Sequence, residues 1–147
     1  ISSDERLYKM VKNLEKEMGR PRCLEITEQL IDLYPKAYHL RTYLASFTDS
    51  EPEKTNLLIQ ALQYMPTDQV ICPYIEDIHI VYPSGFRGRG VRQDMRDGHF
   101  QLIYKMKPEP AAYGSMITML ERWKAAHPAR RKLASLIEEY KKLADKV

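Results

Sequence analysis

Apolar side chains recur every three or four positions through the first part of the chain, the spacing of one face of an α-helix. Four such stripes are Leu7, Met10, Val11, Leu14 and Met18; Leu24, Thr27, Leu30, Ile31 and Tyr34; Ala37, Leu40, Tyr43, Leu44 and Phe47; and Leu57, Leu58, Ala61, Leu62 and Met65. Helix-ending residues follow three of them, at Gly19, Pro35 and Pro66. We therefore predict four short helices, and their tight turns favour antiparallel helical hairpins.

A fifth helix is predicted to begin at Thr67 or Asp68. Its apolar positions are Val70, Ile71, Tyr74, Ile75 and Ile78. Pro73 conflicts with this prediction, because a proline inside a helix removes a backbone donor and bends or breaks the helix. We expect a kink at Pro73 unless it lies in the first turn.

The middle of the chain allows two interpretations. One set of positions alternates as in two strands of a β-hairpin: Ile78, Ile80 and Tyr82, then Phe100, Leu102, Tyr104 and Met106. In the second interpretation the helices continue, because Leu102, Ile103 and Met106 also share one helical face. Either way, residues 83–98 are predicted to form a loop.

Two further helices are predicted at the end of the chain. Their apolar stripes are Met116, Met119, Leu120 and Trp123, then Leu133, Leu136, Ile137, Tyr140 and Leu143. The expected fold is mainly α and forms a single domain over 1–147. It has antiparallel helical hairpins at 4–80, an irregular or β-hairpin insert at 78–107, and two closing helices at 110–147.

The composition is typical of a soluble globular protein. The 147 residues are 44% hydrophobic, which fits one domain with a sizeable core and is too apolar for a disordered chain. We find no apolar run long enough for a membrane span and no signal core at the N-terminus. Cys23 and Cys72 are expected to be thiols in a reducing compartment, which predicts an intracellular location, cytoplasmic or nuclear. The chain begins with Ile1, which suggests an excised piece.

Catalytic and metal-binding residue types are present, but they form no recognisable set. The histidines are scattered, without the close pairing of zinc ligands: His39, His79, His99 and His127. The glycines at 85, 88 and 90 have neither the Lys-Ser/Thr ending of a P-loop nor the spacing of a dinucleotide fingerprint. We therefore predict a protein that is not an enzyme and that uses no metal and no cofactor.

Charge is distributed unevenly along the chain. Residues 1–82 carry nine Lys/Arg and thirteen Asp/Glu, a net charge of −4. Residues 83–147 carry fourteen Lys/Arg and seven Asp/Glu, a net charge of +7. Such a field favours anionic partners at the basic end, unless the basic residues are only solvated helix faces.

The strongest functional candidate is the Arg/Gly-rich segment "SGFRGRGVRQDMRDG", residues 84–98. It contains four arginines, no lysine and four of the six glycines of the chain. Arginine binds phosphate or carboxylate in a bidentate geometry that lysine lacks, and long loops in compact domains are usually functional or disordered. The predicted contact residues, with two basic residues near the C-terminus, are Phe86, Arg87, Arg89, Arg92, Arg131 and Lys132.

Aromatic residues flank this segment at Tyr82, Phe100 and Tyr104. Such rings beside arginines often stack on the bases of single-stranded nucleic acid. The alternative is that these rings only anchor the ends of the segment to the core.

The first half of the chain resembles tetratricopeptide and half-a-tetratricopeptide repeats over about residues 5–80. The closest stretch is "PKAYHLRTYLASFTDSEPEKTNLLIQALQYMP", in which a helix pair ends just before a proline. Pro35 and Pro66 are 31 positions apart, near the period of two-helix repeats. The resemblance implies a scaffold that binds peptides or proteins.

These observations predict a non-enzymatic protein–protein interaction scaffold within a larger intracellular assembly. Its Arg/Gly-rich segment is expected to contact an anionic partner, such as an acidic protein segment. The alternative is an RNA- or DNA-binding module that uses the basic second half. No membrane partner is expected.

Overall fold

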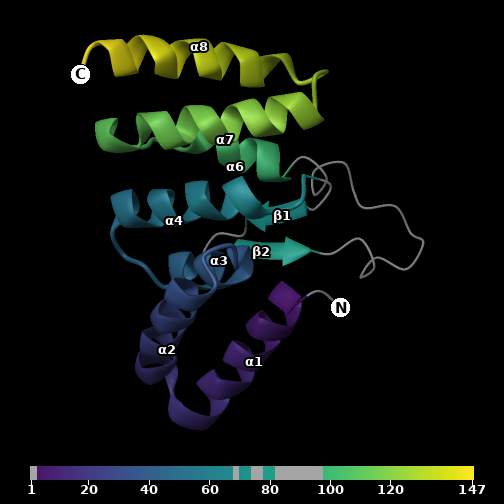
Figure 1. The fold of residues 1–147 in the computed structure, drawn as a ribbon, viewed down its shortest axis with the longest axis vertical. Coiled ribbons are helices and arrows are strands. Elements are labelled where there is room, and N and C mark those ends of the chain that lie inside the picture. The colour runs from purple at the N-terminus through teal and green to yellow at the C-terminus, as the bar shows by residue number, and fades with distance from the viewer. Residues whose placement is uncertain (1–2, 68–69, 74–77, 82–97) are drawn as a thin grey trace. The chain divides into compact units, whose positions relative to one another are not determined.

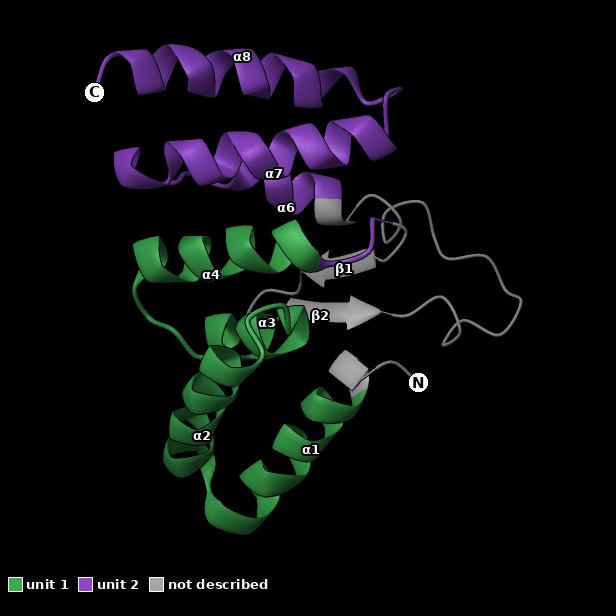
Figure 2. Ribbon diagram, viewed as in Figure 1, with its two compact units in different colours: residues 1–64 green, residues 65–147 purple. Residues whose placement is uncertain are grey.

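The computed structural model describes residues 3–67, 70–73, 78–81 and 98–147. Most of these residues are helical (Figure 1), and the chain divides into two compact units, unit 1 at residues 1–64 and unit 2 at residues 65–147 (Figure 2). The expected fold class, mainly α with packed helical hairpins, is confirmed. The single domain over 1–147 stays a prediction.

Unit 1 consists of four helices. They are α1 (Ser3–Met18), α2 (Arg20–Leu33), α3 (Tyr38–Ser46) and α4 (Glu51–Tyr64). α1 packs along α2, and α3 packs against α1, α2 and α4. The four helices predicted for this part are confirmed, because periodic apolar residues and strong helix breakers act locally and need no distant contact.

Gly19 alone separates α1 from α2. Its φ is 83°, in the left-handed region where a side chain would be strained. Pro21 lies in the first turn of α2, where the missing backbone donor costs little. The pair ends one helix and starts the next in a single step.

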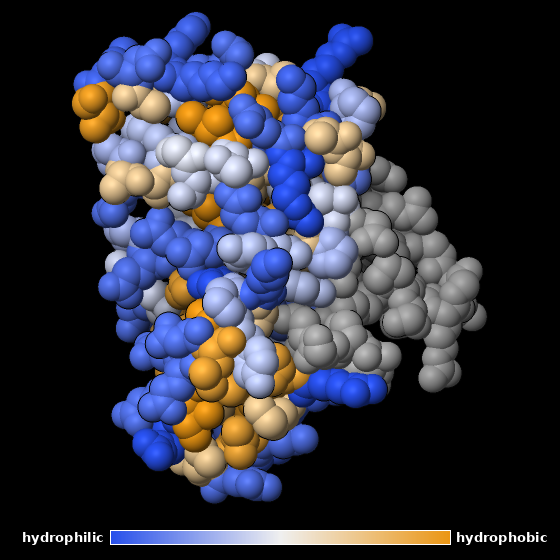
Figure 3. Space-filling model, viewed as in Figure 1, coloured by the Kyte–Doolittle hydropathy of each residue, from blue (hydrophilic) through white to orange (hydrophobic). Residues whose placement is uncertain are grey.

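α4 contributes buried residues to unit 1, and a further hydrophobic cluster is formed by α1, α2, α3 and the turn before α3. The buried members of this cluster are Val11, Cys23, Ile31, Ala37, Leu40 and Tyr43. The predicted stripe of α1 is only partly correct, because Met10 and Met18 are 42% and 39% exposed while Val11 is fully buried. Figure 3 shows hydrophobic side chains on the surface where α1 and α2 lie, so unit 1 leaves apolar area uncovered.

The helices of unit 2 are α6 (Gly98–Lys105), α7 (Tyr113–Ala126) and α8 (Arg131–Asp145), and a short 3₁₀ turn at Pro110–Ala112 precedes α7. α7 and α8 pack against each other as a hairpin. The predicted closing stripes are confirmed except at Leu143, which is only half-buried. Their buried residues are Met116, Met119, Leu120, Trp123, Leu133, Leu136, Ile137 and Tyr140. Within the described ranges, every helix is too short or too polar to cross a lipid bilayer.

The predicted fifth helix is wrong. The segment forms strand β1 (Val70–Pro73), which pairs antiparallel with β2 (Ile78–Val81). Val70 lies opposite Val81, and Pro73 lies opposite Ile78. Pro73 disfavours a helix through this segment, because proline lacks the backbone donor that a helix interior needs. The β-branched residues of both segments favour strands.

Of the two interpretations of the middle of the chain, the pairing of residues 78–82 with residues 100–106 is wrong, and the helix through Leu102 and Ile103 is confirmed. The first segment is a strand, but its partner is β1, and the second segment is the helix α6. Phe100, Ile103 and Met106 are buried at intervals of three, which a helix allows and an alternating strand does not. Of the predicted loop, residues 83–97 lie outside the described residues, and Gly98 begins α6.

Candidate functional site

The predicted contact residues divide into two groups. Phe86, Arg87, Arg89 and Arg92 lie outside the described residues. Arg131 and Lys132 are the first two residues of α8, and both are exposed. The candidate site is therefore built from the start of α8.

Three consecutive cations, Arg130, Arg131 and Lys132, form what we call the cation cluster. Arg130 is the residue that precedes the first turn of α8, no side chain caps this end, and the first turn has no acidic residue. Cations at a helix N-terminus oppose the helix dipole, an effect of about 0.3–1 kcal/mol each at the surface. Helix stability therefore gives no reason for these three residues.

Aromatic rings of α6 hold two members of the cation cluster. The Arg130 guanidinium carbon lies 4.1 Å from the centroid of the Phe100 ring, and the Lys132 Nζ lies 4.6 Å from that of Tyr104. Cations attract ring faces at these distances. The rings therefore fix the direction of long side chains that would otherwise move freely in water.

The two rings serve as anchors rather than as open stacking platforms. Phe100 is 2% exposed and packs edge-on against Trp123, with centroids 6.2 Å apart. Tyr104 stacks beside Phe100 at 6.4 Å, and Lys132 lies over its face. Of the two interpretations of these aromatic residues, anchoring is the one that the geometry favours.

The end of α7 is tied to the first residues of unit 2. His127 Nε2 lies 2.9 Å from the carbonyl oxygen of Thr67, and Arg122 donates to the carbonyl of Met65. His127 also stacks on Trp123, with centroids 5.8 Å apart and planes 11° apart. The two contacts with Met65 and Thr67 join residues 57 and 60 positions apart, so local sequence patterns gave no sign of them.

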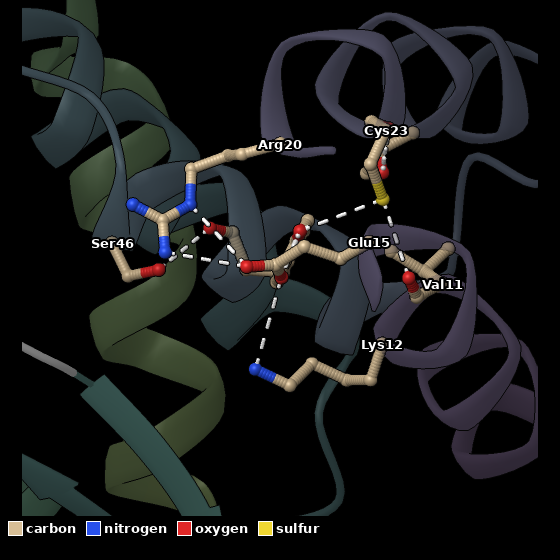
Figure 4. Close-up of polar contacts among 8 residues, drawn as sticks. Val11, Lys12, Glu15, Arg20, Cys23 and Ser46 are labelled. Carbon is tan, nitrogen blue, oxygen red and sulfur yellow. Dashed lines mark hydrogen bonds and ion pairs between the residues drawn. The ribbon is translucent and has the colours of Figure 1, made fainter. Parts of the chain in front are cut away.

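Unit 1 contains a polar network that sequence reasoning also missed. The Tyr43 hydroxyl donates to Glu15 Oε2 at 2.6 Å and lies 3.5 Å from Cys23 Sγ. Figure 4 shows Arg20 and Lys12 directed toward Glu15, at 3.2 Å and 3.9 Å. The hydrogen bond from Tyr43 is the main cause that lowers the pKa of Glu15, and burial is the main cause that raises the pKa of Tyr43.

The network holds helices together rather than presenting a reactive group. Cys23 is fully buried, and its thiol donates to the carbonyl of Val11 at 3.2 Å. Glu15 belongs to α1, Cys23 to α2 and Tyr43 to α3. The hydrogen bonds of Tyr43 and Cys23 therefore join different helices of unit 1. Among the described residues, no group of His, Cys, Asp and Glu could hold a metal ion.

Replacing Tyr43 by phenylalanine is expected to destabilise unit 1 by about 1.5–3 kcal/mol, since a part-buried hydrogen bond to a charged group is lost. The lowered pKa of Glu15 stabilises the fold above its ordinary value of 4.5, and this contribution disappears as the pH falls below that value. Tyr43→Phe should therefore also weaken the loss of stability below pH 4.5. Chemical denaturation at several pH values measures both effects.

Tyr34→Phe is the matched control, because that side chain is 52% exposed. It should change the free energy of unfolding by no more than about 0.5 kcal/mol. Equal effects of the two substitutions would show that the network adds nothing to stability.

Comparison with known proteins gives no assignment. No family model, no curated protein and no solved structure matches the chain.

Proposed function

We propose that this chain is a non-enzymatic protein-interaction module of a larger intracellular assembly. In this proposal the cation cluster and the Arg/Gly-rich segment together bind an acidic segment of a protein partner. The resemblance of residues 5–80 to tetratricopeptide-type repeats stays a prediction, and it agrees with a scaffold.

The observation that carries the proposal is the position of the cation cluster. Three cations occupy an uncapped helix start, where they oppose the helix dipole, and α6 rings orient two of them. Within the part of the chain that the structure describes, neither Arg131 nor Lys132 forms an ion pair. Positive charge and the amide end of a helix both favour a bound anion.

The Arg/Gly-rich segment directly precedes α6 in the chain. Its last residue, Gly98, is the first residue of α6, and α6 carries the rings that contact Arg130 and Lys132. The cations of the segment are therefore connected directly to the element that orients the cluster. An acidic peptide fits this surface, because arginine pairs with carboxylates through two parallel hydrogen bonds.

Nucleic acid is the second candidate partner, and the net charge of +7 over residues 83–147 supports it. The anchored rings favour the acidic protein segment over single-stranded nucleic acid, because Phe100 is buried and Lys132 already lies over the face of Tyr104. Binding to phosphates alone needs no stacking, so experiment must separate the two partners.

Neutralising the cation cluster is expected to weaken binding without weakening the fold. In Arg131→Gln/Lys132→Gln, affinity for a polyglutamate peptide should fall by up to about tenfold, since two exposed ion pairs of about 0.2–1 kcal/mol each are lost. The melting temperature should stay nearly equal, because removing two unfavourable interactions with the helix dipole offsets the loss of the contact between Lys132 and Tyr104. Fluorescence anisotropy and thermal denaturation measure the two effects.

The matched control is Lys142→Gln/Lys146→Gln, which removes the same charge from the other end of α8. It should leave affinity nearly unchanged and lower stability slightly, since cations near a helix C-terminus are favourable. Single-stranded RNA in the same assay over a salt series tests the second candidate. Tighter binding to RNA with a steep loss at high salt would favour nucleic acid, and no binding to either polyanion would contradict both candidates.

The Arg/Gly-rich segment is tested by Arg87→Ala/Arg89→Ala/Arg92→Ala, with Phe86→Ala as a separate variant. We expect the triple variant to lower affinity for the same peptide at least as strongly as the α8 variant. Circular dichroism checks that the helices persist. Unchanged affinity would remove this segment from the proposed surface.

A further inference from the structure

A pocket of about 400 Å³ opens on unit 1. Its lining comes from α1, from the end of α2 with the turn that follows, and from the last residue of α4: Leu7, Leu33, Tyr34, Lys36, Ala37 and Tyr64. We call it the Tyr64 pocket. Its volume lies within the range of sites that bind small molecules or single anchoring side chains.

The rim of the Tyr64 pocket is unusually apolar for a surface. Leu33 is 71% exposed, Tyr34 is 52% exposed and Tyr64 is 42% exposed. They are three of the six large apolar side chains that are exposed among the described residues. Covering this area would remove apolar surface from water, and clustered exposed apolar residues commonly mark interaction sites.

The charge of the lining is one-sided. Lys36 is its only charged residue, and no carboxylate lines the pocket. As far as the structure is described, Lys36 forms no ion pair. Asp32, just before the rim, interacts electrostatically with Arg41.

The turn that carries Lys36 is held in place by Arg41. Arg41 donates from Nη2 to the carbonyl of Pro35 and from Nη1 to Gln60 Oε1, both at 2.6 Å. Gln60 belongs to α4, whose last residue is Tyr64. Arg41 therefore joins two walls of the pocket, so the pocket is largely formed before any partner arrives.

We propose that the Tyr64 pocket binds a large apolar side chain of a partner peptide, whose neighbouring acidic residue pairs with Lys36. The apolar side chain enters between Leu33 and Tyr64. The carboxylate of the neighbouring acidic residue of the peptide lies at the rim, beside Lys36. The Tyr64 pocket belongs to unit 1 alone, so its test is independent of the test of the cation cluster in unit 2.

A second copy of this chain fits the surface less well than an acidic peptide. In a symmetric contact each pocket faces the same patch of its partner, which would bring two Lys36 ammonium groups to one apolar interface. Like charges at an interface oppose association. An acidic peptide supplies the carboxylate that the pocket itself lacks.

Selection of random peptides displayed on phage tests the proposal. We expect the enriched peptides to share a Phe, Trp, Tyr or Leu with an Asp or Glu within one helical turn. Their affinity should fall about tenfold in Leu33→Ser and in Tyr64→Ser, as for truncation of an interface anchor. Met18→Ser is the matched control, since it removes a similarly exposed apolar side chain outside the pocket, and it should leave affinity unchanged.

A charge exchange tests the role of Lys36. Lys36→Glu should weaken binding of the acidic peptides by up to about fivefold, the effect of an exposed ion pair. Replacing the acidic residue of the peptide by Lys should restore binding to Lys36→Glu and weaken binding to the parent. Circular dichroism and melting temperature show that each variant is folded. The parent chain is also tested with the acidic peptide and with its Lys-substituted form, and this comparison needs no protein variant.

Four results would overturn the proposal. They are a basic consensus, no enrichment at all, binding that is unchanged by both rim substitutions, and a charge exchange that restores nothing. Binding of dodecanoate at the pocket without binding of any acidic peptide would assign it to an amphiphile instead. Self-association that disappears in Leu33→Ser, measured by sedimentation, would assign it to a second copy.

Discussion

Deleting residues 129–147, which include α8, is expected to unfold unit 2 and to cause aggregation. Four side chains of α8 are buried against the rest of the unit: Leu133, Leu136, Ile137 and Tyr140. Burying each is worth about 1.5–3 kcal/mol, so their total approaches or exceeds the whole stability of an ordinary domain, about 5–15 kcal/mol. The Tyr140 hydroxyl also donates to the carbonyl of Met106 at 3.1 Å, and this bond would be lost.

Size-exclusion chromatography and the fluorescence of Trp123, the only tryptophan, measure the outcome. The control is Lys142→Ala/Lys146→Ala, which changes an exposed residue of α8 and the exposed residue that follows α8, and it should leave both signals unchanged. If the truncated chain were soluble and monomeric with unchanged fluorescence, α8 would be a detachable arm instead of part of the core. The cation cluster would then belong to a mobile element.

The second large effect is expected for Trp123→Ala, which should destabilise unit 2 by about 3–5 kcal/mol. Trp123 is fully buried, packs against Phe100 and stacks on His127. Removing the indole leaves a cavity between α6 and α7. Because Phe100 also carries Arg130, the substitution should disturb the cation cluster as well as the core.

Denaturant unfolding measures the free energy of unfolding, and affinity for polyglutamate measures the effect on the cation cluster. Lys124→Ala, an exposed change on the next residue, should alter stability by no more than about 0.5 kcal/mol. A loss of stability at Trp123 below about 1 kcal/mol would show that the core relaxes around the gap. Lower affinity in a folded Trp123→Ala would show that the core orients the binding surface.

The sequence alone predicted most helices of this protein. The stripes of α2, α3, α4, α7 and α8 and the breakers Pro35 and Pro66 act over a few residues, and local signals of this kind determine a helix wherever one apolar face is clear. The sequence also identified Arg131 and Lys132 as exposed cations, because a charged side chain on the polar face of a regular helix faces solvent.

Tertiary structure decided what local spacing left ambiguous. The segment 100–106 fits a strand or a helix by pattern, and packing of Phe100 against Trp123 favoured the helix. A strand at 78–82 was one of two interpretations left open by the sequence. The structure has a strand at Ile78–Val81, but it pairs with Val70–Pro73, and a residue pattern of four positions does not encode its partner.

The candidate sites show the same division more sharply. The orientation of Lys132 by Tyr104 and the bond from Tyr43 to Glu15 each join residues 28 positions apart. The Tyr64 pocket combines residues from both ends of unit 1. Sequence determined which side chains are available and which local helices carry them. Only the folded chain brought them together, because the contacts depend on how helix faces pack and not on spacing along the chain.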